Sequence, residues 1–166
     1  MSNLRLDEII IRKAEFRDRA NLAKLAERNT AYHVHFGNMK LVRNRSTLKE
    51  QKKDIRRALR DDFNHRVLVA RYRNKLIGYI IAAIAPPNPF LRYKRTGIIE
   101  DFYVEPGFRG IGIGRMIFSQ AVAWLTRKRV DYVTVLVNAR NVLALKAWKS
   151  FGFGEVVKKM ALNLSR

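Results

Sequence analysis

Apolar residues along the chain recur with two different periods, one typical of strands and one typical of helices. Strand-like segments are short runs rich in Ile and Val, whereas helix-like segments repeat apolar residues every three to four positions. A Pro-rich stretch at residues 86–95 predicts a loop. The expected elements are a strand over 8–12, helices over 17–36 and 47–62, strands over 67–72, 76–83 and 97–104, a helix over 115–127, a strand over 132–137, a helix over 142–150 and a strand over 155–164.

Length and composition favour one globular domain with both helices and strands. The 166 residues are enough for one sizeable core, so we expect a single α/β or α+β domain over residues 1–166. The chain has no cysteine, and its three histidines, His33, His35 and His65, are too few and too scattered to predict a metal site. No apolar run approaches the ~18–20 residues of a membrane span, and the first residues show no signal-peptide pattern. We therefore expect a soluble, cytoplasmic protein without a metal.

The chain is strongly basic. It contains 34 Lys and Arg residues against 14 Asp and Glu residues, a net charge of +20, which attracts polyanions such as phosphate-bearing ligands, RNA or the ribosome. The densest basic region is 43–66, for which Ser46 or Thr47 is the expected helix cap. Its apolar residues predict one buried stripe and are Leu48, Ile55, Leu59 and Phe63. The basic side chains are interpreted either as a solvated helix face or as a contact for RNA or the ribosome.

The most informative stretch is 104–114, which joins a predicted strand to a predicted helix. Gly110, Gly112 and Gly114 alternate there, so backbone N–H groups are left uncovered by side chains at a helix N-terminus. Such donors, together with the positive end of the helix dipole, bind phosphate or pyrophosphate. Arg109 can add a charge-assisted contact. The stretch predicts a ligand that carries phosphate groups.

The spacing within this stretch distinguishes between classes of phosphate loop. A dinucleotide fingerprint needs Gly-x-Gly-x-x-Gly, and here the third glycine falls one residue early. A nucleoside-triphosphate loop needs Gly-Lys-Ser/Thr, and no lysine follows any of these glycines. The pattern Arg-x-x-Gly-x-Gly at Arg109, Gly112 and Gly114 instead resembles the coenzyme A (CoA) pyrophosphate loop of the GNAT superfamily of N-acetyltransferases.

A second motif strengthens the resemblance. Asn141, Ala144 and the run 151–153 (Phe-Gly-Phe) are similar to the family's Asn-x-x-Ala-x-x-x-Tyr-x-x-x-Gly-Phe. The resemblance covers residues 9–164 and is strongest over 98–153. It implies a mixed central sheet with helices on both faces, acetyl-CoA as co-substrate, an amine as acceptor, and a tendency to form dimers.

The resemblance also implies which residues bind CoA. Backbone groups of residues 102–104 pair with the pantetheine arm, and the loop after them holds the pyrophosphate. The expected CoA-binding residues are Phe102, Tyr103, Val104, Arg109, Gly110, Ile111, Gly112, Ile113, Gly114, Arg115, Asn141 and Trp148. A tight strand-to-helix turn without ligand is the alternative for the glycines, and a helix N-cap is the alternative for Asn141.

Glu100 and Asp101 precede the loop and are the candidates for general base. In a regular strand they point to opposite faces, so at least one carboxylate is expected in a low-dielectric setting that raises its pKa. The stretch 100–104 (Glu-Asp-Phe-Tyr-Val) is similar to that of the diamine acetyltransferases, in which the glutamate acts as base. Glu100 is therefore the preferred catalytic residue. A carboxylate that only balances nearby Arg and Lys is the alternative.

One position departs from the family pattern. Trp148 occupies the place of the motif tyrosine, and its indole N–H can donate a hydrogen bond but cannot protonate a leaving thiolate. Tyr103, Tyr93 or water could supply the proton, or the chain could bind CoA without efficient turnover. Two hypotheses follow: an N-acetyltransferase in which a primary amine attacks acetyl-CoA directly in a ternary complex, and a CoA-binding module associated with RNA or the ribosome.

Overall fold

The computed structural model describes residues 5–36, 44–87, 89–90, 92–162 and 164. The chain divides into two compact units, Met1–Leu136 and Val137–Arg166, which are described separately. Four residues of the segments discussed above lie outside the described residues: Arg43 of the basic region, Asn88 and Leu91 of the Pro-rich loop, and Asn163 of the expected closing strand. A single domain over the whole chain stays a prediction.

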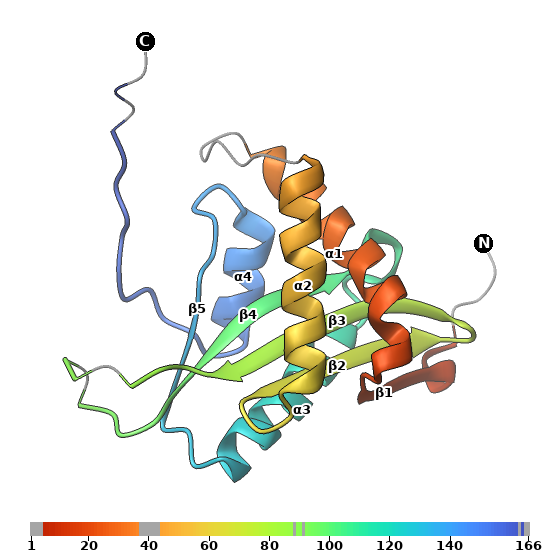
Figure 1. Cartoon of the computed structure of the whole chain (residues 1–166), viewed down its shortest axis with the longest axis horizontal. Helices are drawn as coiled ribbons and strands as arrows, with labels where there is room; N and C mark the ends of the chain where they lie inside the picture. The colour runs from red at the N-terminus through yellow and green to blue at the C-terminus, as the bar shows by residue number, and fades with distance from the viewer. Residues whose placement is uncertain (1–4, 37–43, 88, 91, 163, 165–166) are drawn as a thin grey trace. The chain divides into compact units, whose positions relative to one another are not determined.

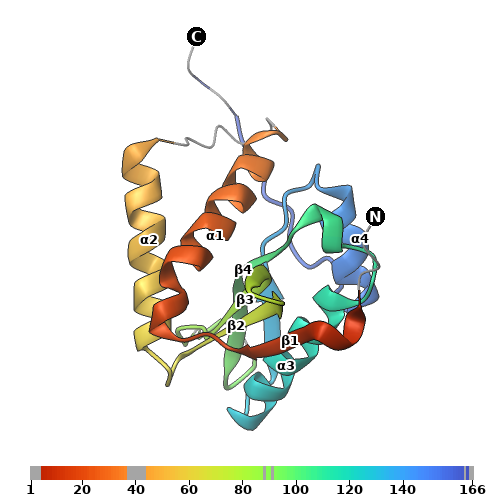
Figure 2. The ribbon, with the colours of Figure 1, turned by 90° about the vertical axis from the view of Figure 1, so that its right-hand side faces the viewer.

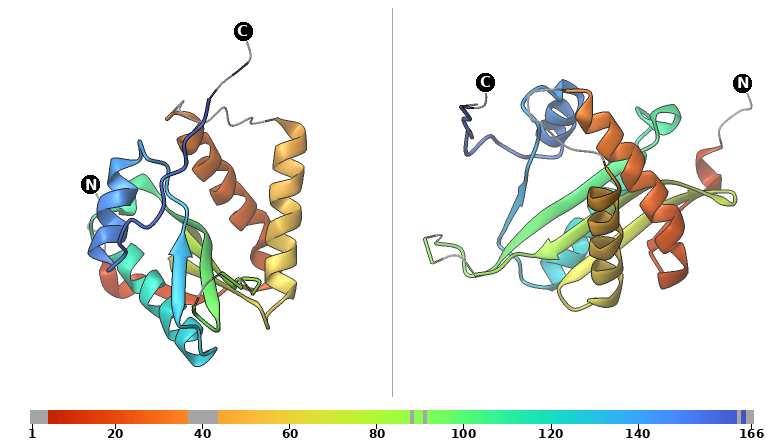
Figure 3. Two further views of the ribbon diagram at one scale, coloured as in Figure 1. Left: turned by 90° about the vertical axis from the view of Figure 1, so that its left-hand side faces the viewer. Right: turned by 45° about the horizontal axis from the view of Figure 1, so that its top comes forward.

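The first unit is built on a mixed five-stranded sheet (Figure 1). The strands lie in chain order. The first three neighbouring pairs are antiparallel, and the pair formed by the fourth and fifth strands is parallel. Figure 3 shows the last strand beside the fourth at the edge of the sheet. The strands are β1 (Ile9–Lys13), β2 (His65–Tyr72), β3 (Lys75–Ile84), β4 (Thr96–Val104) and β5 (Tyr132–Val135).

Helices cover both faces of this sheet, as expected. α1 (Arg19–Val34) and α2 (Arg45–Arg60) lie on one face, and α3 (Ile113–Arg127) lies on the other (Figure 2). Short 3-10 turns at Leu6–Glu8, Phe16–Asp18 and Pro106–Phe108 connect the elements. The second unit contains one helix, α4 (Val142–Ser150).

Apolar side chains are buried on both faces of the sheet: under α3, where Ile113, Ile117 and Leu125 are buried, and between the sheet and the two helices α1 and α2. Apolar side chains from both helices pack there against alternate residues of β2 and β3, because successive strand residues point to opposite faces. Burial of this apolar area is the main stabilising contribution. The cluster includes Leu22, Leu25 and Ala26 of α1, Ile55 and Ala58 of α2, Val67 and Val69 of β2, and Tyr79 and Ile81 of β3.

The start of α2 differs from the expectation. The helix begins at Arg45, and its N-cap is Asn44, whose side chain accepts a hydrogen bond from the Thr47 N–H at 3.0 Å. The Thr47 hydroxyl accepts in return from the Asn44 N–H at 3.0 Å, which completes a capping box. The prediction of Ser46 or Thr47 as cap was wrong because the helix starts earlier and places Thr47 in its first turn.

The end of α2 also corrects the expected apolar stripe. Ile55 is buried and Leu59 packs against the core, but Phe63 is 67% exposed. α2 ends at Arg60, so helical spacing no longer determines where Phe63 points. Its ring instead lies 4.2 Å from the ammonium group of Lys128, which is a cation–π distance.

The closing strand expected at 155–164 is absent from the described residues, which there are 155–162 and 164. Val156, Val157 and Met160 are 69%, 83% and 88% exposed. The prediction rested on β-branched and apolar residues, but a strand is stable only when its backbone groups pair with another strand. The described part of the second unit offers no strand for such pairing.

Candidate active site

The site begins where β4 extends past its parallel neighbour. The ladder between β4 and β5 joins Thr96–Ile99 to Tyr132–Val135, but β4 continues to Val104. Beyond Ile99, the described residues pair β4 only with β3, and Figure 1 shows β4 running on toward the glycine loop. One edge of this internal strand is therefore open to another extended group.

Glu100 occupies a β-bulge at the point where the ladder ends. In the register of β3 with β4, Ile81 faces Asp101 and Ala82 faces Ile99, so Glu100 is the extra residue. A bulge interrupts the alternation of side chains and re-aims them. The expectation that Glu100 and Asp101 point to opposite faces is therefore wrong, because both carboxylates reach groups on the face that α1 and α2 cover.

Asp101 is the less exposed member of this pair and is half-buried. Its carboxylate accepts hydrogen bonds from the Asn29 side chain at 2.7 Å, from the Phe102 N–H at 2.9 Å and from the Tyr79 hydroxyl. Burial raises the pKa of Asp101, while these hydrogen bonds and the nearby His33 act in the opposite direction. The expectation of one carboxylate with a raised pKa thus holds for Asp101.

Asn29 and Tyr79 were not predicted as part of any site. Burial, followed by the charge of Asp101, raises the pKa of the Tyr79 hydroxyl well above its usual range. Asn29 is 7% exposed and lies among the apolar residues of α1. A polar residue on an apolar helix face was the only sequence signal for this network, since such a residue needs a buried partner.

Glu100 is the more accessible of the two carboxylates, with 33% of its side chain exposed. Its Oε2 atom lies 3.7 Å from Nε2 of His65, the first residue of β2. The other ring nitrogen of His65, Nδ1, lies 3.1 Å from Oδ2 of Asp61. Glu100 therefore lies at the end of the β4–β5 ladder, with an imidazole beside it.

The glycine loop leads from β4 to an α3 N-terminus without a side-chain cap. Gly110 and Gly112 have φ values of 79° and 90°, which lie in the left-handed region that favours glycine. Gly112 is the N-cap of α3, and no side chain caps the helix there. A Cβ atom on either glycine would meet nothing within 4 Å, so the loop surface is open. This arrangement suits an anion at the positive end of the helix dipole.

Arg109 ties the glycine loop to the end of β4. Its Nε–H donates to the Val104 carbonyl at 2.8 Å. Its guanidinium carbon lies 5.0 Å from the ring centre of Tyr32 and 5.5 Å from that of Tyr103. The side chain thus positions the loop through a hydrogen bond and two cation–π contacts. A direct contact of Arg109 with pyrophosphate stays a prediction.

Two backbone N–H groups near the open edge of β4 already have hydrogen-bond partners within the fold. The Glu105 N–H donates to the Ile77 carbonyl of β3 at 2.8 Å. Because successive N–H groups of a strand alternate in direction, the Val104 N–H points to the opposite side, where the strand edge is open. The Phe102 N–H, in contrast, donates to Asp101. Of the N–H groups of residues 102–104, that of Val104 is best placed to bind an added extended group, and its pairing with a pantetheine amide stays a prediction.

Tyr103, one of the two tyrosines considered as general acid, lies on the side of the sheet next to α1. Its hydroxyl donates to Oε2 of Glu105 at 3.2 Å, and Glu105 also forms an ion pair with Arg28. Burial raises the pKa of Tyr103, with Glu105 adding to the shift. Tyr93, the other candidate, stacks on Tyr132 with ring centres 4.4 Å apart.

The second unit holds the two remaining predicted residues. The Asn141 side chain accepts a hydrogen bond from the Ala144 N–H at 3.0 Å and caps α4. The Trp148 ring packs edge-on against Phe151 at 5.6 Å and Phe153 at 5.1 Å. The cap that was considered as the alternative for Asn141 is therefore present, Trp148 packs among aromatic rings, and contact of either residue with CoA stays a prediction.

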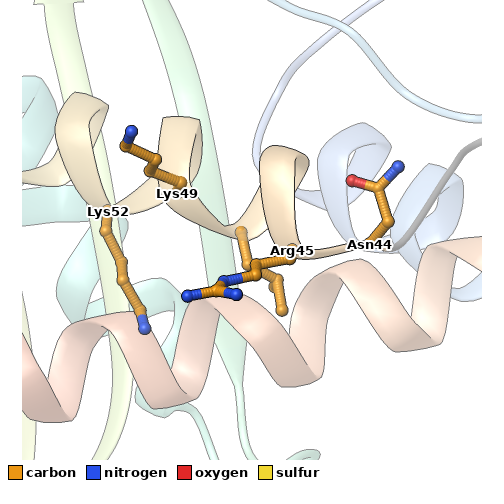
Figure 4. Close-up of a pocket in the computed structure, with 5 residues that line it drawn as sticks. Asn44, Arg45, Lys49 and Lys52 are labelled. Atoms are coloured by element: carbon orange, nitrogen blue, oxygen red, sulfur yellow. The ribbon is translucent and has the colours of Figure 1, made fainter.

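A separate basic hollow lies on α2 (Figure 4). It has a volume of about 580 Å³ and is lined by Asn44, Arg45, Leu48, Lys49 and Lys52. The three cationic residues leave α2 from neighbouring turns, because helical residues three and four positions apart share one face. No carboxylate lines the hollow, so its lining suits an anionic ligand rather than acid–base chemistry.

The described part of the chain contains neither a membrane-spanning helix nor a metal-binding group of side chains. None of its helices is long and apolar enough to cross a membrane. No three His, Asp or Glu side chains within it are grouped so as to hold a metal ion.

Comparison with known proteins identifies the family. The model of the acetyltransferase (GNAT) family matches residues 29–153, and the chain belongs to this family. A variant of the BH1408 protein from Bacillus halodurans is similar in structure, with 26% identity, a TM-score of 0.81, and 94% of this chain and 99% of that chain covered. No curated protein sequence matches the chain significantly.

Two other solved structures share the fold at lower identity. A predicted acetyltransferase from Clostridium acetobutylicum, solved with acetyl-CoA, is 22% identical, with a TM-score of 0.76 and coverage of 94% and 96% of the two chains. The aminoglycoside N-acetyltransferase AAC(6')-Iy, solved with a bisubstrate analogue, is 15% identical, with a TM-score of 0.71 and coverage of 95% and 99%. The mixed sheet with helices on both faces is thus the GNAT fold.

The raised pKa of Asp101 predicts how stability depends on pH. Because its pKa is raised in the folded state, the folded protein holds this proton to higher pH than the unfolded chain, and the associated stability is lost as pH rises through the folded pKa. Asp101→Asn keeps acceptors for Asn29 and Phe102 and removes the charge. Urea unfolding between about pH 3 and pH 8, a range that starts below the usual pKa of Asp, should show the variant gaining stability relative to the wild type as pH rises.

The matched control for this prediction is Asp54→Asn, which removes an exposed carboxylate from α2. A stability difference between the Asp101→Asn variant and the wild type that stays constant across this pH range would contradict the assignment of a proton to Asp101.

Proposed function

We propose that this chain transfers the acetyl group of acetyl-CoA to a primary amine, by direct attack of the amine within a ternary complex. The observation that carries the proposal is the continuous path along β4. It leads from the accessible carboxylate of Glu100, along the open strand edge, to the α3 N-terminus that no side chain caps. A cofactor with a thioester at one end, amides in the middle and a pyrophosphate at the other end matches this order of groups.

The pyrophosphate is placed at the glycine loop and the first turn of α3. Backbone N–H groups and the helix dipole favour a negative charge there, and the +20 net charge of the chain attracts the anionic cofactor. The proposed binding segment is Gly110, Ile111, Gly112, Ile113, Gly114 and Arg115. The pantetheine arm then pairs with the edge of β4 at the Val104 N–H, as an added strand would.

The chemical step needs a neutral amine beside the thioester. Glu100 takes a proton from the substrate ammonium group, and the freed lone pair of the nitrogen attacks the thioester carbonyl carbon. A C–N bond forms, the C–S bond breaks, and the CoA thiolate leaves and takes a proton from a water molecule, which in turn takes the second proton of the attacking nitrogen. Water is chosen as the source because the Tyr103 hydroxyl is held by Glu105 and Trp148 cannot act as an acid.

Substitution of Glu100 tests its role as base. Glu100→Gln keeps the size and polarity of the side chain but cannot accept the proton, so kcat should fall by roughly 10²- to 10⁴-fold, as for loss of a general base. CoA affinity, measured by calorimetry, should stay unchanged because the cofactor is held elsewhere. Glu50→Gln, on the exposed surface of α2, is the matched control and should keep wild-type activity. Full activity of Glu100→Gln would remove this residue from the base role.

Substitution of Gly112 tests the cofactor loop. Gly112→Val introduces a branched side chain at φ 90° and covers the loop surface, so the Kd for CoA should rise at least about tenfold, or ~1.4 kcal/mol. Gly107→Val is the matched control, because a Cβ there meets nothing within 4 Å and φ lies outside the left-handed region. Equal CoA affinity of a folded Gly112→Val variant and the wild type would contradict the loop assignment.

A second candidate function is association with RNA or the ribosome through α2. The basic hollow at Arg45, Lys49 and Lys52 supports this candidate, since its cationic side chains share one helix face. A double substitution, Lys49→Gln with Lys52→Gln, should weaken the salt dependence of binding to single-stranded RNA. The negative slope of log affinity against log salt should become shallower by about 1.4. The same charge change at Lys158 and Lys159 is the control, and an identical salt slope for both double variants would exclude α2 as the contact.

A further inference from the structure

His65 lies between two carboxylates that come from different elements. Its Nδ1 atom is 3.1 Å from Asp61 at the C-cap of α2, and its Nε2 atom is 3.7 Å from Glu100 on β4. Only 11% of the His65 side chain is exposed. The two ring nitrogens face different acids, so the ring connects Asp61 to Glu100 rather than chelating one ion.

The fold holds Asp61, His65 and Glu100 in place relative to one another. α2 ends at Arg60, and the following turn is closed by hydrogen bonds from the Asn64 N–H to the Asp61 carboxylate at 3.1 Å and from the His65 N–H to the Asp61 carbonyl at 2.9 Å. The strand registers pair His65 with Ala83 and Ala83 with Ile98. Glu100 follows two positions after Ile98 on the same face, so its carboxylate reaches across to the ring.

The charge state of Asp61 determines how the ring is oriented. Hydrogen bonds from the Asn64 N–H and the Asn64 side chain, followed by the contact with His65, lower the pKa of Asp61. Asp61 therefore stays a carboxylate and accepts the Nδ1–H of the neutral ring. That tautomer leaves a lone pair on Nε2, and this lone pair faces Glu100.

The other charged side chains near this turn are engaged with one another. Asp62 pairs with Lys13 at 2.7 Å and with Arg66 at 3.6 Å. The guanidinium carbon of Arg66 lies 5.5 Å from the ring centre of Trp124, which belongs to the opposite face of the sheet. Ala83, the partner of His65 on β3, carries no charge. Asp61 and Glu100 are therefore the charged groups that face the ring from α2 and β4.

We propose that His65, held by Asp61, is a positioning residue that removes the proton from Glu100 after each acetyl transfer. The proposal rests on the proposed function of Glu100 as base. Glu100 takes the proton from the substrate ammonium, and the O–H bond then breaks as an N–H bond forms at Nε2 of His65. The imidazolium is stabilised by the Asp61 carboxylate until its Nε2 proton passes to water, which restores the neutral ring and an ionised Glu100.

The experiment compares three variants with the wild type in acetyl transfer to a primary amine that the wild type accepts. His65→Gln should lower kcat at least about tenfold, less than the roughly 10²- to 10⁴-fold loss expected for the base itself, and should leave the Kd for CoA unchanged. The pH–rate profile of this variant should differ from that of the wild type, because the variant lacks the proton acceptor beside Glu100. The double variant Glu100→Gln/His65→Gln should be no slower than Glu100→Gln alone, because His65 acts only through Glu100.

Two further variants keep the proposal open to refutation. Asp61→Asn should lower kcat because the ring loses the acceptor that fixes its tautomer, and added imidazole should restore turnover in His65→Ala. His35→Gln, an exposed histidine after α1, is the control and should match the wild type.

Three results would overturn the relay. They are a wild-type pH profile in His65→Gln, losses that add in the double variant, and failure of imidazole to restore a His65→Ala protein that still binds CoA. The proposed function fails by a different result, namely absence of turnover in the wild type or full activity of Glu100→Gln, and the relay then fails with it.

Discussion

Internal strands of a sheet normally have hydrogen-bond partners along both edges, because unpaired backbone N–H and C=O groups are costly inside a protein. β4 departs from this rule within the part of the chain that the structure describes. Its parallel partner β5 pairs only as far as Ile99, and β4 continues to Val104. The rest of the site depends on this difference in length. The bulge at Glu100 starts where the ladder ends, and the glycine loop and α3 follow from the strand terminus.

The bulge gives two adjacent acids different surroundings on one face of the sheet. Asp101 is held by Asn29 and Tyr79, and burial raises its pKa, so it serves mainly to fix β4 against α1 and β3. Glu100 stays one-third exposed beside His65. A regular strand would have separated the two carboxylates to opposite faces. The irregularity instead keeps both beside the helices that cover this face, where one stabilises the strand and the other is accessible to a substrate.

The sequence predicted the parts of the structure that depend on local patterns. Helical and strand periodicity placed nine of the ten expected elements, and the spacing of Arg109, Gly112 and Gly114 identified the family. Features that depend on register were missed. One extra residue in β4 changes which face Glu100 and Asp101 share, and no composition signal marks it. His65 was an isolated histidine in the sequence, and only the combined registers of three strands bring it to Glu100. The closing strand was wrong because β propensity does not supply a pairing partner.

Hydrogen exchange by mass spectrometry, with and without CoA, tests the central claim most directly. If the open edge of β4 and the α3 N-terminus hold the cofactor, CoA should slow amide exchange in peptides that cover residues 102–104 and 110–115. Peptides from β1 and from the basic face of α2 should exchange at the same rate in both states. Unchanged exchange at 102–104 and 110–115 under saturating CoA, or protection confined to α2, would contradict the account.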